Sequence, residues 1–197
     1  MTTPSVSNPS APALPETGSG LPLAAGVWPI DPAHSGVYFQ VRHLGLTNVR
    51  GRFDLFNGTL TIGETLADVA IDATIDMASV NTNQPDRDAH LRSTDFFDVE
   101  HHPTMHYRSL SVTEGEDGYQ VAGELTINAT TQPVSLAVEF NGVDVHPADG
   151  RTRAGFAATT EIRRSDYGID FNMPLGAGKL ALGDKIKIEL DLQFIAP

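Results

Sequence analysis

The sequence contains no cysteine, which excludes disulfide bonds, thiolate metal ligands and cysteine nucleophiles. Basic residues are scarce, since 13 Lys and Arg stand against 25 Asp and Glu, for a formal net charge of −12. Nucleic-acid binding needs clustered cations, so we expect no nucleic-acid partner. No apolar run approaches the roughly 18 residues of a transmembrane helix. The N-terminal stretch lacks the cations and apolar segment of a secretory signal, so we expect a cytoplasmic protein.

The N-terminal segment differs in composition from the rest of the chain. Residues 1–26 are rich in Pro, Ser, Thr, Ala and Gly and show no hydrophobic periodicity, which predicts a disordered N-terminal arm. Residues 27–197 are then expected to form the domain. Within it, apolar and polar residues alternate, most clearly in residues 67–77 and 185–194. A period of two is typical of antiparallel strands with one face in water.

Turn-forming residues divide this pattern into eight strands. The expected strands cover residues 36–43, 49–62, 67–78, 104–114, 118–128, 132–145, 152–164 and 184–195. Because closure removes exposed strand edges, we predict an all-β, eight-stranded antiparallel, lipocalin-like up-and-down barrel. Long connections at residues 79–103 and 165–183 are expected at the barrel mouth. The first follows the third strand and should contain a short helix from Asp86 to Thr94.

An ordered series of motifs runs through the same region. Its most specific stretch is Arg87-Asp88-x-His90-Leu91-x-Ser93-x-Asp95-Phe96-Phe97-Asp98. Others are Trp28-x-x-Asp31-x-x-His34-Ser35, Phe39-x-Val41-x-His43, Arg164-Ser165-Asp166-Tyr167-Gly168 and Gly183-Asp184-x-Ile186-x-Ile188. By these motifs residues 27–195 resemble the YceI-like family of polyisoprenoid-binding proteins. The resemblance implies a lipocalin-like barrel around an isoprenoid chain, and many relatives of this kind are exported.

Side chains on one face of a strand have either odd or even residue numbers, which we call the parity of the strand. Strand parity and the family resemblance together indicate which side chains face the barrel interior. We expect an apolar chain to contact Phe39, Val41, Phe53, Val69, Ile71, Ile75, Tyr107, Leu125, Ile188 and Leu190. Parity assigns most of these cavity residues, while the family motif places Phe53 and Tyr107. Small inward residues, among them Ala73 and Gly123, favour an interior that side chains do not fill completely.

The polar head of such a ligand is expected at the barrel mouth. The mouth residues that we predict are His34, His43, Arg87, Phe96 and Phe97. Arginine suits a phosphate head because its guanidinium donates two parallel hydrogen bonds. The two phenylalanines cap the core, either as a structural plug or as part of the ligand site. The alternative for the charged helix residues is a set of surface ion pairs, Asp88 with Arg92 and Arg92 with Asp95.

Two further clusters are interpreted as structural. His101, His102 and His106 together could bind zinc. Adjacent residues of an extended chain point apart, however, so we expect no metal site. Residues 31–35 contain Asp, His and Ser, but they are too close in sequence to converge as a triad, and no Gly-x-Ser-x-Gly motif is present. We therefore expect no catalytic residue.

These observations predict a binding protein that is not an enzyme and uses no cofactor. It would sequester or transport a polyprenyl phosphate or an isoprenoid quinone in the barrel cavity, because burial removes an almost insoluble chain from water. The alternatives are a hydrolase or quinone-coupled redox enzyme that uses the mouth histidines, and a stress-response scavenger of apolar compounds. The expected partner is the apolar lipid, with transient contact to a membrane, and the protein is either a monomer or a homodimer.

Overall fold

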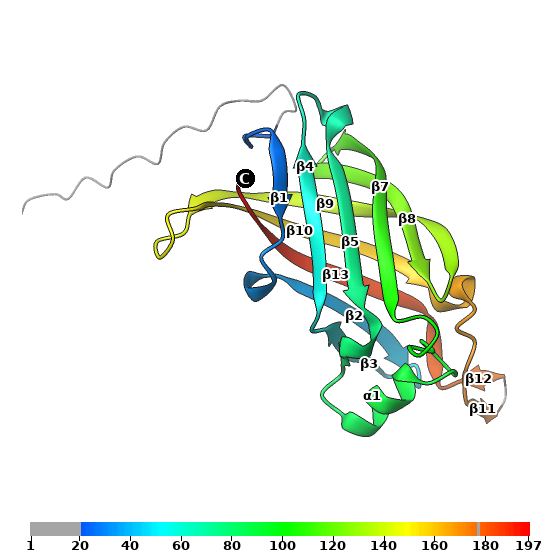
Figure 1. The fold of residues 1–197 in the computed structure, drawn as a ribbon. Coiled ribbons are helices and arrows are strands. Elements are labelled where there is room, and N and C mark those ends of the chain that lie inside the picture. The colour runs from blue at the N-terminus through cyan, green and yellow to red at the C-terminus, as the bar shows by residue number, and fades with distance from the viewer. Residues whose placement is uncertain (1–20, 177) are drawn as a thin grey trace, which may run out of the picture.

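The fold is dominated by one antiparallel sheet, as Figure 1 shows for the computed structural model, which describes residues 21–176 and 178–197. Among these residues eleven strands form the sheet, in the order β1-β4-β5-β7-β8-β9-β10-β13-β2-β3-β6, and β11 and β12 form a separate hairpin. The strands are β1 Gly26–Pro29, β2 Gly36–His43, β3 Thr47–Phe53, β4 Phe56–Ile62, β5 Ala70–Asp76, β6 Val80–Asn81, β7 Thr104–Gly115, β8 Gly118–Ile127, β9 Thr130–Val145, β10 Thr152–Arg163, β11 Pro174–Gly176, β12 Lys179–Leu180 and β13 Leu182–Ile195. The all-β class is as predicted, but the expected count of eight strands is not what these residues form.

The helical segments are short. In the described part of the chain the single α-helix is α1, Pro85–Arg92, and it lies in the first long connection, as expected. It ends before Thr94 because Ser93 has extended dihedrals and caps it, donating its amide hydrogen to the carbonyl of His90 at 3.1 Å. Within the same described residues, four 3₁₀-helices cover Pro32–His34, Leu66–Asp68, Met77–Ser79 and Arg164–Tyr167. None of the helices within the described residues is long and apolar enough to cross a membrane.

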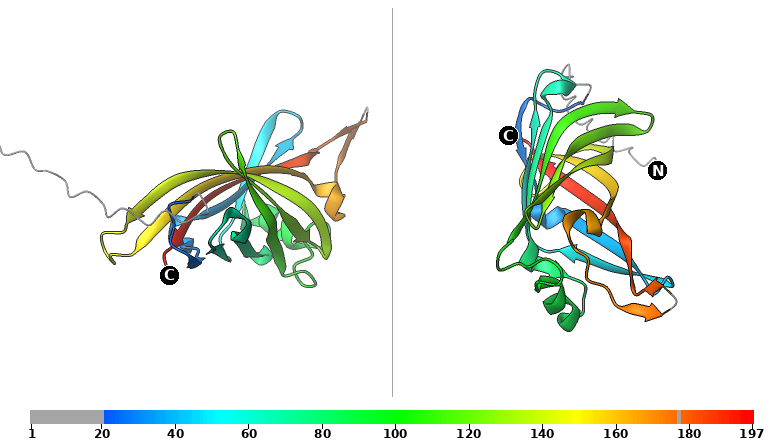
Figure 2. Two further views of the ribbon diagram at one scale, coloured as in Figure 1. Left: turned by 90° about the horizontal axis from the view of Figure 1, so that it is seen from above. Right: turned by 90° about the vertical axis from the view of Figure 1, so that its right-hand side faces the viewer.

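The sheet is curled because one expected strand is broken. Residues 49–62 do not form a single strand; the chain changes direction at Asp54 and Leu55 and separates β3 from β4. β3 pairs with β2, whereas β4 pairs with β5, which lies far from β2 in the strand order. Since only two residues connect β3 to β4, the two ends of the sheet must approach each other. Figure 2 shows the resulting half-barrel.

The predicted alternation explains which face of the sheet turns inward. Phe39 of β2 lies opposite Ile188 of β13, and Leu190 of β13 lies opposite Ala158 of β10. Val121 and Leu136 form the corresponding pair between β8 and β9. Apolar side chains therefore face each other across successive strands, and their burial supplies the main favourable term in folding.

Gly123, one of the small inward residues, makes room for the aromatic ring of Tyr107 and adds no open space to the interior. A Cβ atom at Gly123 would lie 2.5 Å from the hydroxyl oxygen of Tyr107, so the ring occupies the place of a side chain there. The buried hydroxyl donates a hydrogen bond to the carbonyl of Val121 at 3.1 Å. The expectation that Gly123 helps to leave the interior open is therefore wrong.

The ordered domain begins earlier than the composition predicts. Leu21 and Leu23 are buried in the core, and the indole of Trp28 donates a hydrogen bond to the carbonyl of Ala24 at 2.9 Å. The expected arm of residues 1–26 is thus wrong for residues 21–26. Its remaining part, residues 1–20, lies outside the described residues.

Leu23→Ala should therefore destabilise the domain by about 2–5 kcal/mol, the range for deletion of a buried leucine side chain. Val27, four residues after Leu23, is 52% exposed, so Val27→Ala should change the stability by less than about 0.5 kcal/mol and serves as the control. Thermal unfolding of the two variants measures the difference. Equal melting temperatures for Leu23→Ala and wild type would show that the leucine contributes nothing.

Candidate ligand-binding cavity

The curled sheet encloses a cavity of about 520 Å³. Its wall is formed by inward side chains of the long strands and is mostly aliphatic and aromatic. All ten predicted cavity residues line it: Phe39, Val41, Phe53, Val69, Ile71, Ile75, Tyr107, Leu125, Ile188 and Leu190. This volume lies within the range of about 300–1,000 Å³ that is usual for small-molecule sites. That these residues contact a ligand stays a prediction.

Small side chains create space in one part of the wall. Ala73 of β5 lies opposite Gly58 of β4 and Tyr107 of β7, and all three residues line the cavity. Ala158 of β10 also lines the cavity. A larger residue at Ala73 would project from the wall into this space, which makes that position the natural site for a blocking substitution.

The two long connections meet at one end of the cavity, the end where we predicted the mouth. Phe96 and Phe97, which follow α1, both line the cavity, as do His43 and Arg87. The ring of Phe97 lies 6.0 Å from that of Phe53 at the end of β3. These four predicted mouth residues therefore surround one end of the cavity.

A second aromatic group joins the two connections. The rings of Phe96 and Phe171 are 5.2 Å apart, and the ring of His90 packs edge-on against both, at 5.0 and 4.9 Å. His90 also contacts the carboxylate of Asp95 at 2.8 Å. Residues 79–103 and 165–183 thus meet over the mouth, as expected.

Arg87 is held at the mouth by neutral oxygens. Its Nε donates to the hydroxyl of Thr82 at 2.7 Å and its Nη2 donates to the carbonyl of the same residue at 2.9 Å. The Thr82 hydroxyl in turn donates to the carboxylate of Asp88. Within the described residues no carboxylate lies at ion-pair distance from this guanidinium. Arg87 consequently keeps its charge available to a ligand.

The alternative set of surface ion pairs on α1 does not form. Arg92 donates to the carbonyls of Ala78 and Val80 at 2.7 and 2.9 Å, while Asp88 accepts from Thr82. Arg92 therefore fixes α1 to the segment before it, through hydrogen bonds that the i, i+3 and i, i+4 spacings do not reveal.

Arg164 is a cavity residue that we did not predict. It is only 8% exposed, and its guanidinium donates to the carbonyls of Gly183, Ile169 and Phe171 at 3.1, 2.7 and 2.8 Å. These bonds hold the second long connection against β13. The motif that begins at Arg164 was the available signal, but nothing in it indicates which carbonyls the side chain reaches.

The buried tyrosines are not suited to proton transfer near neutral pH. Burial raises the pKa of Tyr107 and of Tyr167 to about 12 in each case. Both phenols line the cavity and stay uncharged at pH 7. They are polar groups in an apolar wall and are poor general bases.

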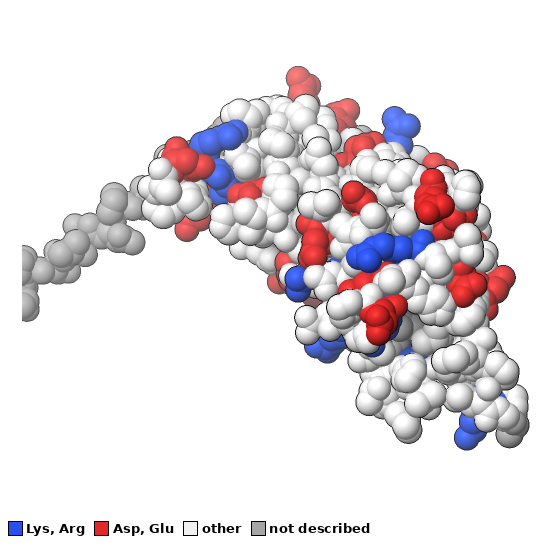
Figure 3. All heavy atoms as spheres, turned by 60° about the horizontal axis from the view of Figure 1, so that its bottom comes forward, with Lys and Arg blue, Asp and Glu red and all other residues white. Residues whose placement is uncertain are grey.

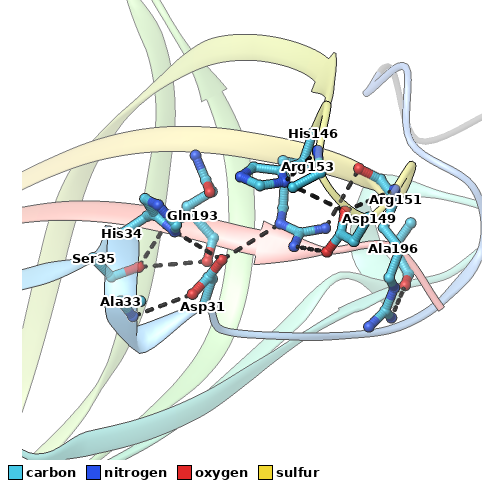
Figure 4. A network of polar contacts seen from close by, with 11 residues as sticks. Asp31, Ala33, His34, Ser35, His146, Asp149, Arg151, Arg153, Gln193 and Ala196 are labelled. Carbon is cyan, nitrogen blue, oxygen red and sulfur yellow. Dashed lines mark hydrogen bonds and ion pairs between the residues drawn. The ribbon is translucent and has the colours of Figure 1, made fainter.

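His34 does not lie at the mouth, which corrects its expected position. It contacts the carboxylate of Asp31 at 3.0 Å, and that carboxylate also pairs with Arg153 at 3.4 Å (Figure 4). Arg153 belongs to the beginning of β10, whereas the mouth lies beyond the end of that strand. Burial opposes ionisation of Asp31, but hydrogen bonds from His34 and the Ala33 amide hold its pKa below the ordinary value. The cluster fastens the opposite end of the half-barrel.

The three histidines considered for zinc have separate partners. His101 contacts Asp98 at 2.9 Å, and His106 contacts Asp72 at 3.1 Å. Among residues 21–176 and 178–197 no group of three or more His, Asp or Glu side chains has a geometry that could hold a metal ion. The absence of a metal stays a prediction.

Comparison with known proteins assigns the chain to a family. Residues 28–194 match the family model of the YceI-like domain. The chain belongs to the YceI-like family. The UPF0312 protein SA2479 of Staphylococcus aureus strain N315 is 39% identical over 168 residues, which cover 83% of this chain and 94% of that relative. The predicted resemblance is therefore confirmed.

Solved structures of similar fold support the architecture. The YCEI protein of Campylobacter jejuni is 27% identical with a TM-score of 0.66, over 79% of this YceI-like chain and 90% of that one. BcnA of Burkholderia cenocepacia has a TM-score of 0.71 at 20% identity, over 83% and 98% of the two chains. A polyisoprenoid binding domain from Saccharophagus degradans has a TM-score of 0.62 at 18% identity, over 86% and 98%. The last two show the fold alone.

Proposed function

We propose that this YceI-like protein binds a long apolar isoprenoid, either a polyprenyl phosphate or an isoprenoid quinone, and carries it without catalysis. The observation that carries the proposal is the apolar cavity of about 520 Å³ inside the half-barrel. Membership of the YceI-like family and the likeness to a polyisoprenoid binding domain support the same ligand class.

The hydrophobic effect supplies the driving force for binding of the isoprenoid chain. Burial of each methylene group contributes about 0.8 kcal/mol, so several isoprene units provide a large gross free energy of binding. Association and ordering of the chain consume much of it. Several polar side chains at the mouth make structural hydrogen bonds, among them Arg87 with Thr82, His90 with Asp95 and Arg164 with three backbone carbonyls. The arrangement therefore favours sequestration.

The head group would lie beside Arg87, whose guanidinium reaches the cavity and has only neutral partners among the described residues. Arg87→Ala should weaken binding of a polyprenyl phosphate by about 1.5–3 kcal/mol, the contribution of a hydrogen bond to a charged group. That change corresponds to roughly 10- to 150-fold in Kd. Binding of an isoprenoid quinone with the same number of isoprene units should hardly change, because its head is neutral.

Titration of delipidated wild type and Arg87→Ala with both ligands measures this difference. The quinone is the internal control, since a general disturbance of the mouth would weaken both ligands equally. A variant that binds the phosphate as tightly as wild type would exclude Arg87 as the head-group site. Failure of the wild type to bind either ligand would contradict the proposed function itself.

A further inference from the structure

Two neighbouring hairpins beside the mouth expose an unusual number of apolar side chains. Ten large hydrophobic residues are exposed in the described part of the chain, and five of them lie on these hairpins. We call these five the hairpin patch: Leu44 (42% exposed), Leu46 (73%), Met173 (56%), Leu175 (49%) and Leu180 (56%). Contiguous exposed apolar residues of this kind mark interaction surfaces, unlike single scattered ones.

The two hairpins that carry the patch are bonded to each other at their bases, and the patch adjoins the cavity. The amide of Leu44 donates to the carbonyl of Ala181 at 2.7 Å, so the turn between β2 and β3 is bonded to the chain that follows β12. The right view of Figure 2 shows this turn next to the β11–β12 hairpin, while the left view shows that the tips of the two hairpins diverge. Met173 belongs to the patch and also lines the cavity. Apolar surface therefore extends from the hairpins to the mouth.

The charge around the hairpin patch is opposite in sign to that of the protein. Residues 42–50 and 171–183 contain Arg42, Arg50 and Lys179 but no Asp or Glu, in a chain of net charge −12. No described carboxylate lies at ion-pair distance from any of the three cations. A hydrogen bond from Lys187, together with the charge of Arg50, lowers the pKa of Glu189, however, so Arg42 and Lys179 are the cations farther from acidic groups. In Figure 3 the lobe at lower right, where β11 and β12 lie, is almost free of acidic side chains, whereas acidic groups are frequent on the remainder of that face.

We propose that the hairpin patch docks the protein on the surface of an anionic lipid bilayer. The leucines would enter the boundary between head groups and acyl chains, and the three cations would face the anionic head groups. Because screening confines charge effects to about 10 Å, the local cations act at the contact while the acidic remainder stays remote. The cavity mouth would then open at the bilayer surface. The proposal goes beyond isoprenoid binding, since docking does not require an occupied cavity.

The test compares vesicle binding of wild type with that of a double variant, Leu46→Ser with Leu180→Ser. Flotation with vesicles of phosphatidylcholine and phosphatidylglycerol should recover the wild type, and vesicles of phosphatidylcholine alone should recover less. The double variant should bind the anionic vesicles roughly tenfold or more weakly, because each serine removes apolar surface that the leucine would bury in the bilayer. Leu110→Ser is the matched control, since Leu110 is 65% exposed on β7, away from both hairpins.

A second measurement locates the contact. The chain has no cysteine, so Leu46→Cys accepts a single environment-sensitive dye, whose emission should shift to shorter wavelength when anionic vesicles are added. The same dye at Leu110→Cys should not respond. Isoprenoid binding by the double variant should equal that of wild type, which separates failure of this proposal from failure of the proposed function.

Three outcomes would overturn the docking proposal. They are a wild type that does not bind anionic vesicles, a double variant that binds them as well as wild type, and a dye at Leu46→Cys that does not respond. A concentration-dependent dimer that the double variant abolishes, in the absence of vesicle binding, would assign the hairpin patch to a second copy of the chain.

Discussion

Ala73→Phe should weaken the binding of long isoprenoids by roughly a hundredfold while the protein stays folded. Ala73 lines the cavity between Gly58 and Tyr107, and its side chain points into the space that a ligand would occupy. A phenyl ring there would displace several methylene groups of the chain. At about 0.8 kcal/mol for each methylene, loss of four corresponds to about 3 kcal/mol, or roughly a hundredfold in Kd.

The matched control is Ala70→Phe on the same strand. Ala70 is exposed and has the opposite parity, so its substituent would project into solvent and binding should be unchanged. Overpacking at Ala73 costs about 1–3 kcal/mol in a filled core, and less where the ring enters open space. Titration with polyprenyl phosphate, together with thermal unfolding, measures both effects. Wild-type affinity in Ala73→Phe would show that the interior is not the binding site.

Arg164→Met should have the largest effect on stability and should also loosen the mouth. The substitution removes three hydrogen bonds to carbonyls, among them that of Phe171, whose ring packs on Phe96. The bond to Ile169 is buried and those to Gly183 and Phe171 are partly buried. A buried acceptor left without a donor costs about 1–3 kcal/mol and a partly buried one less, so we expect a loss of roughly 3 kcal/mol. The melting temperature should fall by about 6–12 °C, at 2–4 °C for each kcal/mol in a domain of this size.

The neighbouring residue supplies the control. The side chain of Arg163 is 60% exposed and contacts Asp184 at 3.4 Å in a surface ion pair, so Arg163→Met should cost less than about 1 kcal/mol. In Arg164→Met a bound isoprenoid should also dissociate faster, because the second long connection loses its attachment over the mouth. Stopped-flow displacement of a fluorescent isoprenoid measures that rate. Equal stability of the two variants would show that the three hydrogen bonds contribute little.

Much of the fold could be predicted because alternation of apolar residues is a local signal. It identified the inward faces of the long strands and hence cavity residues such as Ile71 and Leu190. The break between β3 and β4 had a signal that we missed. Within the expected strand of residues 49–62, the inward residues have odd numbers up to Phe53 and even numbers from Phe56 to Leu60, and all three of these residues line the cavity. A change of parity within one expected strand therefore indicated that the strand ends there.

Other features depend on contacts between distant parts of the chain. Leu23 belongs to a segment of loop-like composition, and only the core that the strands build allows it to be buried. His34 was assigned to the mouth from its motif, but its position follows from Asp31 and Arg153, which lie far apart in the sequence. The partners of Arg164 are backbone carbonyls, which no residue type reveals. Local patterns predict faces, whereas the ends of the half-barrel depend on tertiary contacts.

Native mass spectrometry of the protein purified without detergent, followed by organic extraction of the lipid, tests the central claim most directly. We predict one isoprenoid chain for each polypeptide, bound without turnover and lost in Ala73→Phe but retained in Ala70→Phe. Where the purified protein is empty, added polyprenyl phosphate or isoprenoid quinone should fill it to the same stoichiometry. A wild-type protein that carries no isoprenoid and takes up neither compound would contradict the account.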